Sequence, residues 1–545
     1  YFYDSFGRVE TELQEIDGKY FYKHFGYHAE LNRLQKKSFF WRPKELQDDY
    51  TQKPFAWQSY GVKYLYNSRG AMTLVKDSHN KTWWSNPEYD NFGRVIEYTN
   101  GNGVRTIHDI DPLTQRVESI LSTKSSYRYQ DWSYEYTGNG NLESRTDNRS
   151  FPGYFSSSQT ESYGYNVRNE LTKVNGATVN QFDPEGNLTR KKIFGNSSLV
   201  SVDYNYEMDS SGTISNGKLS SMSLTTYSSQ IFSFDYDANG NLLRRWEGGE
   251  IDYEVEWTSF NKPLEVARMG NYERFVYDAN QTRIMSISFD GSSPVKQLYI
   301  SGEMEQIERA TSPGSGNYHS SSSWDLWDWS AEAIRIYIQT PSGRIGSLEY
   351  DMTAPLGAKL NRRWHHLDRM GNLDCVTYED DGFPVEGTAY AYDAWGLPRQ
   401  SAENWGDDGA YNQDTFVWPD ESTDRGYTNH EMLETIGLIH MNARLYDPII
   451  GQFISPDSVT PAPMSAQDIS RYAYVYNNPF RYIDPSGHSS VSIDWSGQKS
   501  LDPVIVKNDD GSFTVMMGKE DAANLSDEDK ADLKAAFEKA DSAAR

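Results

Sequence analysis

The chain has 545 residues and a formal net charge of −26, from 78 acidic and 52 basic side chains. Such an acidic surface repels phosphate backbones, so we expect no nucleic-acid partner. The lone cysteine, Cys375, excludes an internal disulfide framework, and no apolar run approaches the ~18 residues of a membrane-spanning helix. Tyrosine (39) and glycine (41) are abundant. Because Tyr, Thr and Val favour strands while Gly, Asn and Asp favour turns, this composition predicts an all-β protein with many short strands.

A phrase of the form Tyr-Asp-x-x-Gly, followed by an apolar residue, returns along the chain. The copies, some of them loose, are residues 3–9, 89–95, 136–142, 165–171, 182–188, 236–242, 277–280 and 392–397. The stretches between them alternate apolar and polar residues, as in 251–257, which is typical of strands. In each phrase we expect the aromatic residue to end a strand, the Asp or Asn to bond the backbone two residues on, and the Gly to take a positive φ. Since one hairpin is marginal in water, we predict that the hairpins stack into a long spiral ribbon.

Tyr-Asp-x-x-Gly units in this number resemble the YD repeats of bacterial RHS proteins, Tc-toxin C subunits and teneurins. The resemblance covers residues 1–425 and implies a long spiralling antiparallel sheet of hairpins that forms a hollow cocoon. Because Tyr1 lies inside a repeat, we expect the chain to be a segment of a longer polypeptide.

The sequence motifs of residues 426–488 differ from those of the repeats. Their landmarks are residues 437–448, 451–457, 471–479 and the Asp-Pro-Ser-Gly run 484–487. This segment resembles the RHS repeat-associated core, which ends the shell in Tc-toxin C subunits and can act as an aspartyl autoprotease that cuts just after its Asp-Pro-x-Gly motif. The resemblance implies Asp457 and Asp484 as the catalytic pair, Arg444 as the supporting cation, and cleavage near Gly487–His488.

Paired carboxylates suit that chemistry. Two close carboxylates cannot both ionise easily, so one holds a proton while the other activates water, and a nearby Arg keeps the second one charged. Without the resemblance, the same residues fit ordinary turns and a structural ion pair, so both interpretations stay open. Two departures bear on the choice: His488 stands where cleaving relatives usually carry Leu, and the segment from Asp457 to Asp484 is longer than in toxin C subunits.

Residues 489–545 form the predicted C-terminal tail, where relatives carry variable toxins. Residues 503–507 and 512–516 flank a turn and predict a hairpin, and the acidic residues 526–529 open a helix with an apolar stripe. We therefore expect a small α/β tail. It has no cysteine, no metal-ligand spacing and no Ser-His-Asp order, so we expect an inert, truncated or unrecognised effector, or a small module that contacts the shell.

Three further motifs each have a functional and a structural interpretation. Residues 235–240 match the start of a calcium loop, but Trp246 stands where the bidentate Glu is required, so we interpret them as a repeat turn. The His365–Asp368 run resembles the segment that leads into the core. The third motif is a group of three tryptophans, Trp324, Trp327 and Trp329. If packed, they anchor a long insertion; if exposed, they form a platform on which sugars stack. We predict no cofactor and no metal.

The leading functional hypothesis is an encapsulating shell of a secreted RHS polymorphic-toxin-type protein. Its cargo would be its own C-terminal tail, and its partner a secretion-system or toxin-complex component. The alternative is an extracellular or cell-surface protein that binds glycans or proteins without proteolysis. A third class, a glycoside-acting enzyme, needs a carboxylate pair at a defined separation, and no pair is singled out. We expect a secreted or surface location on a bacterium.

Overall fold

In the computed structural model, the described residues are 1–41, 58–149, 158–195, 198–208, 210, 214–224, 230–312, 328–353, 360–379, 389–399, 423–458, 470–488, 490–492, 504–507 and 513–516. They form long antiparallel sheets in which each strand pairs with the next one along the chain. The predicted all-β fold is confirmed. Among the described residues no helix is long and apolar enough to cross a membrane.

The first sheet of the described chain has fifteen strands in sequence order. They are β1 (Phe2–Tyr3), β2 (Val9–Ile16), β3 (Lys19–Tyr27), β4 (Leu34–Trp41), β5 (Gln58–Tyr66), β6 (Met72–Asp77), β7 (Thr82–Tyr89), β8 (Val95–Asn100), β9 (Arg105–Ile110), β10 (Val117–Lys124), β11 (Tyr127–Tyr136), β12 (Leu142–Asp147), β13 (Gln159–Tyr165), β14 (Leu171–Val174) and β15 (Ala177–Thr178).

The second sheet has sixteen strands, again in sequence order. They are β16 (Asn180–Phe182), β17 (Leu188–Gly195), β18 (Ser198–Met208), β19 (Ile214–Leu224), β20 (Gln230–Tyr236), β21 (Leu242–Glu247), β22 (Glu250–Trp257), β23 (Pro263–Arg268), β24 (Asn271–Tyr277), β25 (Arg283–Phe289), β26 (Val295–Ile300), β27 (Met304–Ser312), β28 (Asp328–Thr340), β29 (Gly343–Asp351), β30 (Leu360–Leu367) and β31 (Leu373–Tyr378). Val179 links the two sheets, because its N–H donates to the Thr172 carbonyl (2.8 Å) and its carbonyl accepts from the Lys192 N–H (2.7 Å).

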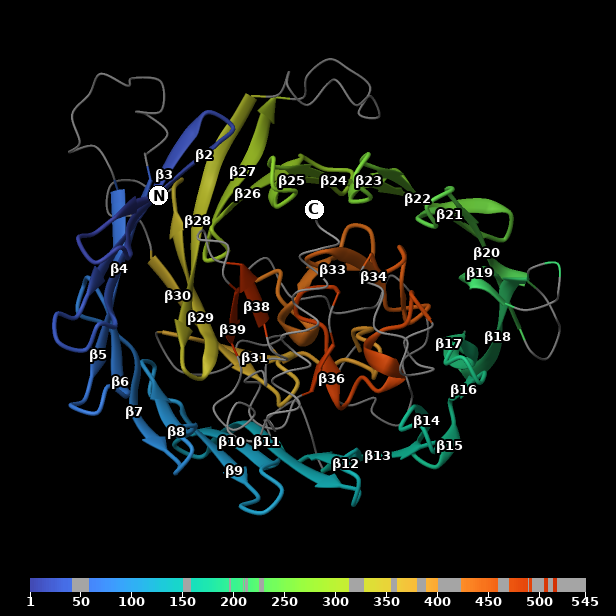
Figure 1. The fold of residues 1–545 in the computed structure, drawn as a ribbon, viewed down its shortest axis with the longest axis horizontal. Helices are drawn as coiled ribbons and strands as arrows, with labels where there is room; N and C mark the ends of the chain where they lie inside the picture. The colour runs from blue at the N-terminus through green and yellow to red at the C-terminus, as the bar shows by residue number, and fades with distance from the viewer. Residues whose placement is uncertain are drawn as a thin grey trace.

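The ribbon of sheet curves round until its late strands lie beside its first ones (Figure 1). Buried side chains of β2–β8 and of β25–β30 share one hydrophobic core. At its centre the indole N–H of Trp364 donates to the Trp83 carbonyl (3.0 Å), and the two ring centroids lie 5.2 Å apart. Ion pairs also connect the first and the late strands, such as Lys19 of β3 with Glu308 of β27 (2.9 Å). The overlap therefore closes the ribbon into the shell that the repeats predicted.

The repeat turns behave as their composition predicts. In the copy at Asp237, one carboxylate oxygen accepts the backbone N–H groups of Asn239 and Asn241, each at 2.8 Å, and Gly240 has a φ of +91°. Because this carboxylate is engaged within its own turn, the stretch 235–240 serves as a repeat turn.

The repeat tyrosines do more than the sequence indicated. A tyrosine at or near the end of one strand donates its hydroxyl to the carbonyl of the first residue of an earlier strand, as Tyr66 does to Leu34 (2.6 Å) and Tyr165 to Leu142 (2.9 Å). The other pairs are Tyr27 with Val9, Tyr89 with Met72, Tyr136 with Val117, Tyr206 with Leu188 and Tyr277 with Pro263. Each such bond satisfies a carbonyl where the strand ladder begins.

The described residues 423–458, 470–488 and 490–492 follow the second sheet and form the inner segment, which lies inside the ring (Figure 1). Its elements are the 3₁₀ turns η6 (Tyr427–Asn429) and η8 (Val475–Asn477), the four-stranded sheet β32 (Glu431–Leu433), β33 (Leu438–Met441), β34 (Arg444–Asp447) and β35 (Gln452–Phe453), and the pair β36 (Tyr482–Ile483) and β37 (Val491–Ser492). Its apolar side chains pack on the inner face of β17–β24. The buried Asp447 there pairs with Arg245 and accepts the Tyr253 hydroxyl (3.0 Å).

The predicted hairpin of the tail is present as β38 (Val504–Lys507) and β39 (Phe513–Met516). The predicted tail helix, Trp324 and Trp327 lie outside the described residues, whereas Trp329 is half-buried in β28. The division of the chain at residues 425 and 488 stays a prediction.

Candidate functional site

The three residues expected to form a proteolytic site lie together inside the ring. Arg444 begins β34, Asp457 follows β35, and Asp484 follows β36. One guanidinium nitrogen of Arg444, Nη2, lies 3.0 Å from Asp457 Oδ2 and 3.4 Å from Asp484 Oδ2. All three side chains are largely buried, with exposed fractions of 5%, 13% and 3%. The fold thus brings both carboxylates to one cation from three separate strand ends.

Asp484 folds the chain that follows it into a tight loop. Its Oδ1 accepts the backbone N–H groups of Gly487 (2.8 Å) and His488 (3.0 Å). Gly487 has a φ of +77°, and a Cβ at this position would lie 2.0 Å from the Met441 carbonyl oxygen. Only glycine therefore fits at position 487, the last residue of the Asp-Pro-Ser-Gly run.

Arg444 also contacts the peptide bond between Gly487 and His488. Its Nε donates to the Gly487 carbonyl oxygen, and its Nη1 donates to the Arg471 carbonyl (3.2 Å). The guanidinium carbon lies 3.5 Å from the centroid of the Phe453 ring, which fixes its plane. Burial lowers the pKa of Arg444, against the opposite influence of Asp457 and Asp484. The Gly487–His488 peptide thus has a cation at its oxygen and a carboxylate at its nitrogen.

Sequence reasoning missed two contacts of this cluster. His488 is expected at the cleavage point, and the structure adds that its Nδ1 lies 3.0 Å from Asp457 Oδ1. The Arg471 side chain donates to the Asp457 carbonyl (3.1 Å from Nε), and the Asp457 N–H donates to the Arg471 carbonyl (3.0 Å). Nothing in the local pattern pairs residues 457 and 471, because they lie 14 residues apart and a period-2 strand pattern relates only near neighbours.

The histidines singled out in the sequence serve the shell. His365 Nε2 contacts Ser347 Oγ (3.1 Å), and His366 Nε2 contacts Thr377 Oγ1 (2.9 Å). Burial lowers the pKa of His366 to about 3, so the ring is neutral. Across the residues that the structure describes, no group of three or more His, Cys, Asp or Glu side chains could hold a metal ion.

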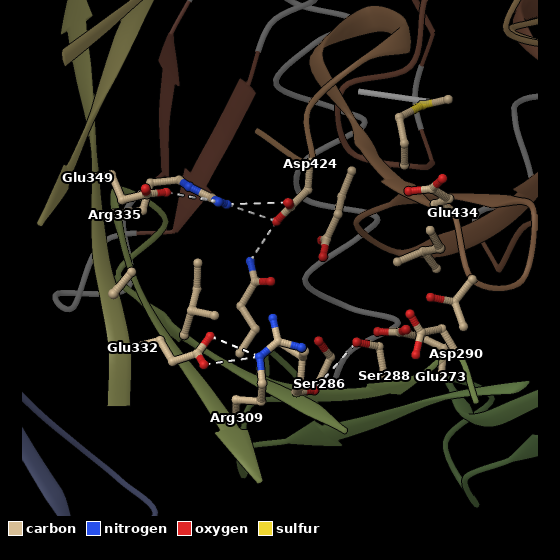
Figure 2. Close-up of a pocket in the computed structure, with 18 of the residues that line it drawn as sticks. Glu273, Ser286, Ser288, Asp290, Arg309, Glu332, Arg335, Glu349, Asp424 and Glu434 are labelled. Carbon is tan, nitrogen blue, oxygen red and sulfur yellow. Dashed lines mark hydrogen bonds and ion pairs between the residues drawn. The ribbon is translucent and has the colours of Figure 1, made fainter. Parts of the chain in front are cut away.

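A cavity of about 510 Å³ separates strands β24–β29 from residues 424–435 (Figure 2). Acidic side chains dominate its lining; those labelled in the figure are Glu273, Asp290, Glu332, Glu349, Asp424 and Glu434. Two arginines offset part of this charge, because Arg309 lies 3.0 Å from Glu332 and Arg335 lies 3.2 Å from Asp424.

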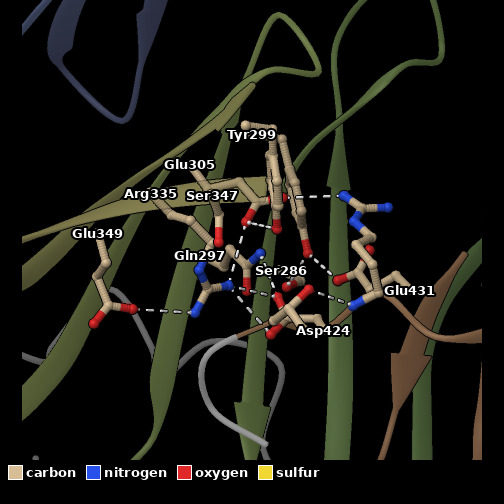
Figure 3. Close-up of polar contacts among 12 residues, drawn as sticks. Ser286, Gln297, Tyr299, Glu305, Arg335, Ser347, Glu349, Asp424 and Glu431 are labelled. Carbon is tan, nitrogen blue, oxygen red and sulfur yellow. Dashed lines mark hydrogen bonds and ion pairs between the residues drawn. The ribbon is translucent and has the colours of Figure 1, made fainter. Parts of the chain in front are cut away.

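The polar contacts around this cavity join the shell to the inner segment (Figure 3). Asp424 accepts from Gln297 (2.9 Å), and Glu431 accepts from the Tyr299 hydroxyl (2.5 Å). Burial and the neighbouring Glu431 raise the pKa of Glu273 to about 8. Because its polar groups pair across the boundary, we assign this region to holding the segment in place.

Comparisons with known proteins agree with the fold. The sequence matches no protein-family model. It is 25% identical over 363 residues to the tRNA3(Ser)-specific nuclease WapA of Bacillus spizizenii, a match that covers 65% of this chain and 11% of the nuclease. It is 22% identical over 444 residues to the toxin subunit YenC1 of Yersinia entomophaga, covering 73% of this chain and 42% of the subunit.

Among solved structures, TcdB2-TccC3 without its hypervariable C-terminal region superposes with a TM-score of 0.53 at 14% identity. The superposition covers 88% of this chain and 25% of the other, so the chain spans only a fraction of these relatives. The shared feature is the shell of antiparallel β-sheet. In sequence the chain is thus similar to the WapA nuclease and the YenC1 toxin subunit, and in fold it is similar to TcdB2-TccC3.

Proposed function

We propose that this chain is an encapsulating shell that cuts its own Gly487–His488 bond and so separates the C-terminal tail, its cargo, from the shell. The observation that carries the proposal is the contact of Arg444 and Asp484 with the two ends of that one peptide group. In keeping with its toxin-type relatives, the shell would act as a component of a toxin complex or a secretion system outside the cell.

The proposed hydrolysis assigns one role to each side chain. A water oxygen adds to the Gly487 carbonyl carbon as Asp457 takes a proton from that water. Arg444 stabilises the negative charge that develops on the carbonyl oxygen. The carbon–nitrogen bond then breaks, and the proton taken from the water passes through Asp484 to the His488 nitrogen, 3.0 Å from its Oδ1. The products are a carboxyl group on Gly487 and an amine on His488.

Intact mass of the purified full chain tests the proteolysis. We expect two fragments that meet at Gly487–His488 in the wild type and an uncut chain in both Asp457→Asn and Asp484→Asn. Asp278→Asn is the matched control, because Asp278 holds a repeat turn by accepting the Asn280 N–H (2.9 Å) and the Thr282 N–H (2.8 Å), neither of them a residue of this site. An uncut wild-type chain, or cleavage in both Asn variants, would refute the proposed reaction.

Encapsulation needs a separate test. We expect the tail to resist added trypsin in the native protein, cut or uncut, and to be digested once denaturant opens the shell. Rapid digestion of the tail in the native state would remove the cargo role while leaving the proteolysis result untouched. The alternative of a glycan-binding surface protein stays a prediction, and a glycan array tests it.

A further inference from the structure

A second cavity, of about 410 Å³, lies where the two sheets and the inner segment meet. The first sheet contributes His108 from β9, the second sheet contributes Ser342 and Arg344 at the β28–β29 turn, and the inner segment contributes Arg425 and Thr428. A group bound here would touch three parts of the chain that are distant in sequence.

Polar atoms without hydrogen-bond partners gather around this cavity. They are Arg344 Nε and Nη1, Arg425 Nε, Ser342 Oγ and His108 Nδ1. Each is buried, and within the described part of the chain none has a hydrogen-bond partner. A buried donor left unsatisfied costs the desolvation of that group, and an unpaired buried charge costs more. Their convergence on one cavity indicates a polar occupant.

The charge of the cavity is positive. Arg344 stacks on the Tyr337 ring (4.1 Å to its centroid) and has no ion pair with any described carboxylate. Arg425, by contrast, lies 3.0 Å from Glu305. Burial, and next Arg425, lower the pKa of Arg344 to about 10, which leaves it charged at neutral pH.

One carboxylate, Asp368, is among the residues that line the cavity. It already accepts the backbone N–H groups of Met370 (2.8 Å) and Asn372 (2.9 Å) and the Asn372 side-chain amide (2.8 Å). These contacts lie within its own repeat turn, and no hydrogen bond or ion pair of the described residues joins Asp368 to Arg344.

We propose that this cavity binds a small oxyanion of the phosphate or carboxylate class, with Arg344 as its charge partner. Such an anion carries several acceptor oxygens. They match the guanidinium, hydroxyl and imidazole donors that different elements contribute to the cavity. The volume lies within the usual range for small-ligand sites. Neither Asp457 nor Asp484 lines the cavity, although Ile483 and Pro485, on either side of Asp484, do. Anion binding and self-cleavage are therefore measured separately.

Thermal unfolding and calorimetry of the full chain test the site with sodium phosphate, sulfate and acetate as probes, against sodium chloride at equal ionic strength. We expect the melting temperature to rise with the logarithm of the phosphate concentration, because a ligand that binds only the folded state stabilises it. Chloride should leave the melting temperature unchanged. A response to phosphate and sulfate alone supports a tetrahedral anion, and a response to acetate as well supports the carboxylate class.

Arg344→Met gives the sharper result. We expect it to abolish the phosphate response and to raise the melting temperature of the anion-free protein, because it removes an unpaired buried charge. Arg274→Met is the matched control: Arg274 pairs with Glu265 at 3.2 Å, away from the cavity, and its loss should leave the phosphate response intact. Ser342→Ala, a milder change, should weaken phosphate binding several-fold without loss of folding.

Three results would overturn the proposal. The first is a wild-type protein that responds to none of the oxyanions. The second is an equal phosphate response in wild type and Arg344→Met. The third is a lower melting temperature of anion-free Arg344→Met than of wild type, because the guanidinium would then already be satisfied.

Discussion

The hydroxyl groups of the repeat tyrosines explain why most copies of the repeat begin with Tyr and not, as the copy at Phe182 does, with Phe. Packing on the apolar face needs only the ring, but the hydroxyl satisfies a carbonyl at the start of a neighbouring ladder, as between Tyr165 and Leu142. Such a carbonyl lies where a strand begins and would otherwise depend on water. The tyrosine thus links one repeat to the previous one through a single side chain.

Tyr165→Phe should lower the free energy of unfolding by about 1 kcal/mol, because it removes this bond and leaves the Leu142 carbonyl unpaired. The shift in urea midpoint measures the effect. Tyr3→Phe is the control, since Tyr3 is 59% exposed. Equal midpoints for Tyr165→Phe and wild type would show that water replaces the hydroxyl without cost.

Glu273 should make stability depend on pH. Its pKa is raised from 4.5 in the unfolded chain to about 8 in the folded one, so the folded protein holds an extra proton between these values. Stability therefore falls as pH rises from about 4.5 to about 8 and then levels off, with a slope contribution of ~1.4 kcal/mol per pH unit.

Urea midpoints from pH 5 to pH 9 check this dependence. Glu273→Gln should flatten the curve, because the amide needs no proton to stay neutral beside Glu431. Glu254→Gln serves as the control, since that side chain is 48% exposed and pairs at the surface with Arg244. A Glu273→Gln curve as steep as that of the wild type would assign the pH dependence to other groups.

At the scale of elements, the loop after β36 decides whether the proposed site exists. Asp484 and Gly487 act together: the carboxylate gathers two backbone N–H groups, and the positive φ of the glycine turns the Gly487 carbonyl toward Arg444. Either residue alone is common in turns, and the combination aims one peptide group at the cluster.

Gly487→Ala should abolish self-cleavage and destabilise the inner segment by about 1–3 kcal/mol, because a Cβ would meet the Met441 carbonyl at 2.0 Å and φ is +77°. Intact mass and thermal unfolding give the two readouts. Gly270→Ala is the matched control, with a φ of +87° and open space around its Cβ position. It should cost some stability and leave cleavage unchanged. Full cleavage in Gly487→Ala would show that this loop does not position the bond.

At the scale of the whole molecule, the overlap of the two sheets is what turns a ribbon into a closed shell. β7 and β30 meet through Trp83 and Trp364, both almost fully buried, and Asp77 pairs across the same joint with Arg362 (2.7 Å). The inner segment then has walls on several sides.

Trp364→Ala should open this joint, since truncating a buried tryptophan costs about 3–5 kcal/mol. We expect a larger radius of gyration in solution scattering and faster tryptic digestion of the tail. Trp246→Ala, which removes a half-buried indole bonded to Asp235 (2.8 Å), should change neither. An unchanged radius of gyration and an unchanged digestion rate in Trp364→Ala would show that other contacts close the shell.

The sequence by itself determined the all-β class, the hairpins and the turns, because each repeat turn is made by hydrogen bonds within five consecutive residues, as at Asp237. The resemblance of the inner segment to the RHS core also named Arg444, Asp457 and Asp484, three residues that lie together in the structure. Local chemistry and a distinctive motif are both visible in a single chain.

Only the tertiary structure decided which distant residues meet. The contact of His488 with Asp457, the closure of the ribbon at Trp364 and the donor-lined cavity at Arg344 all depend on how small twists accumulate over some thirty strands. No single repeat encodes that sum. The neighbours of each strand can be read from the chain, and the residues that face one another across the ring cannot.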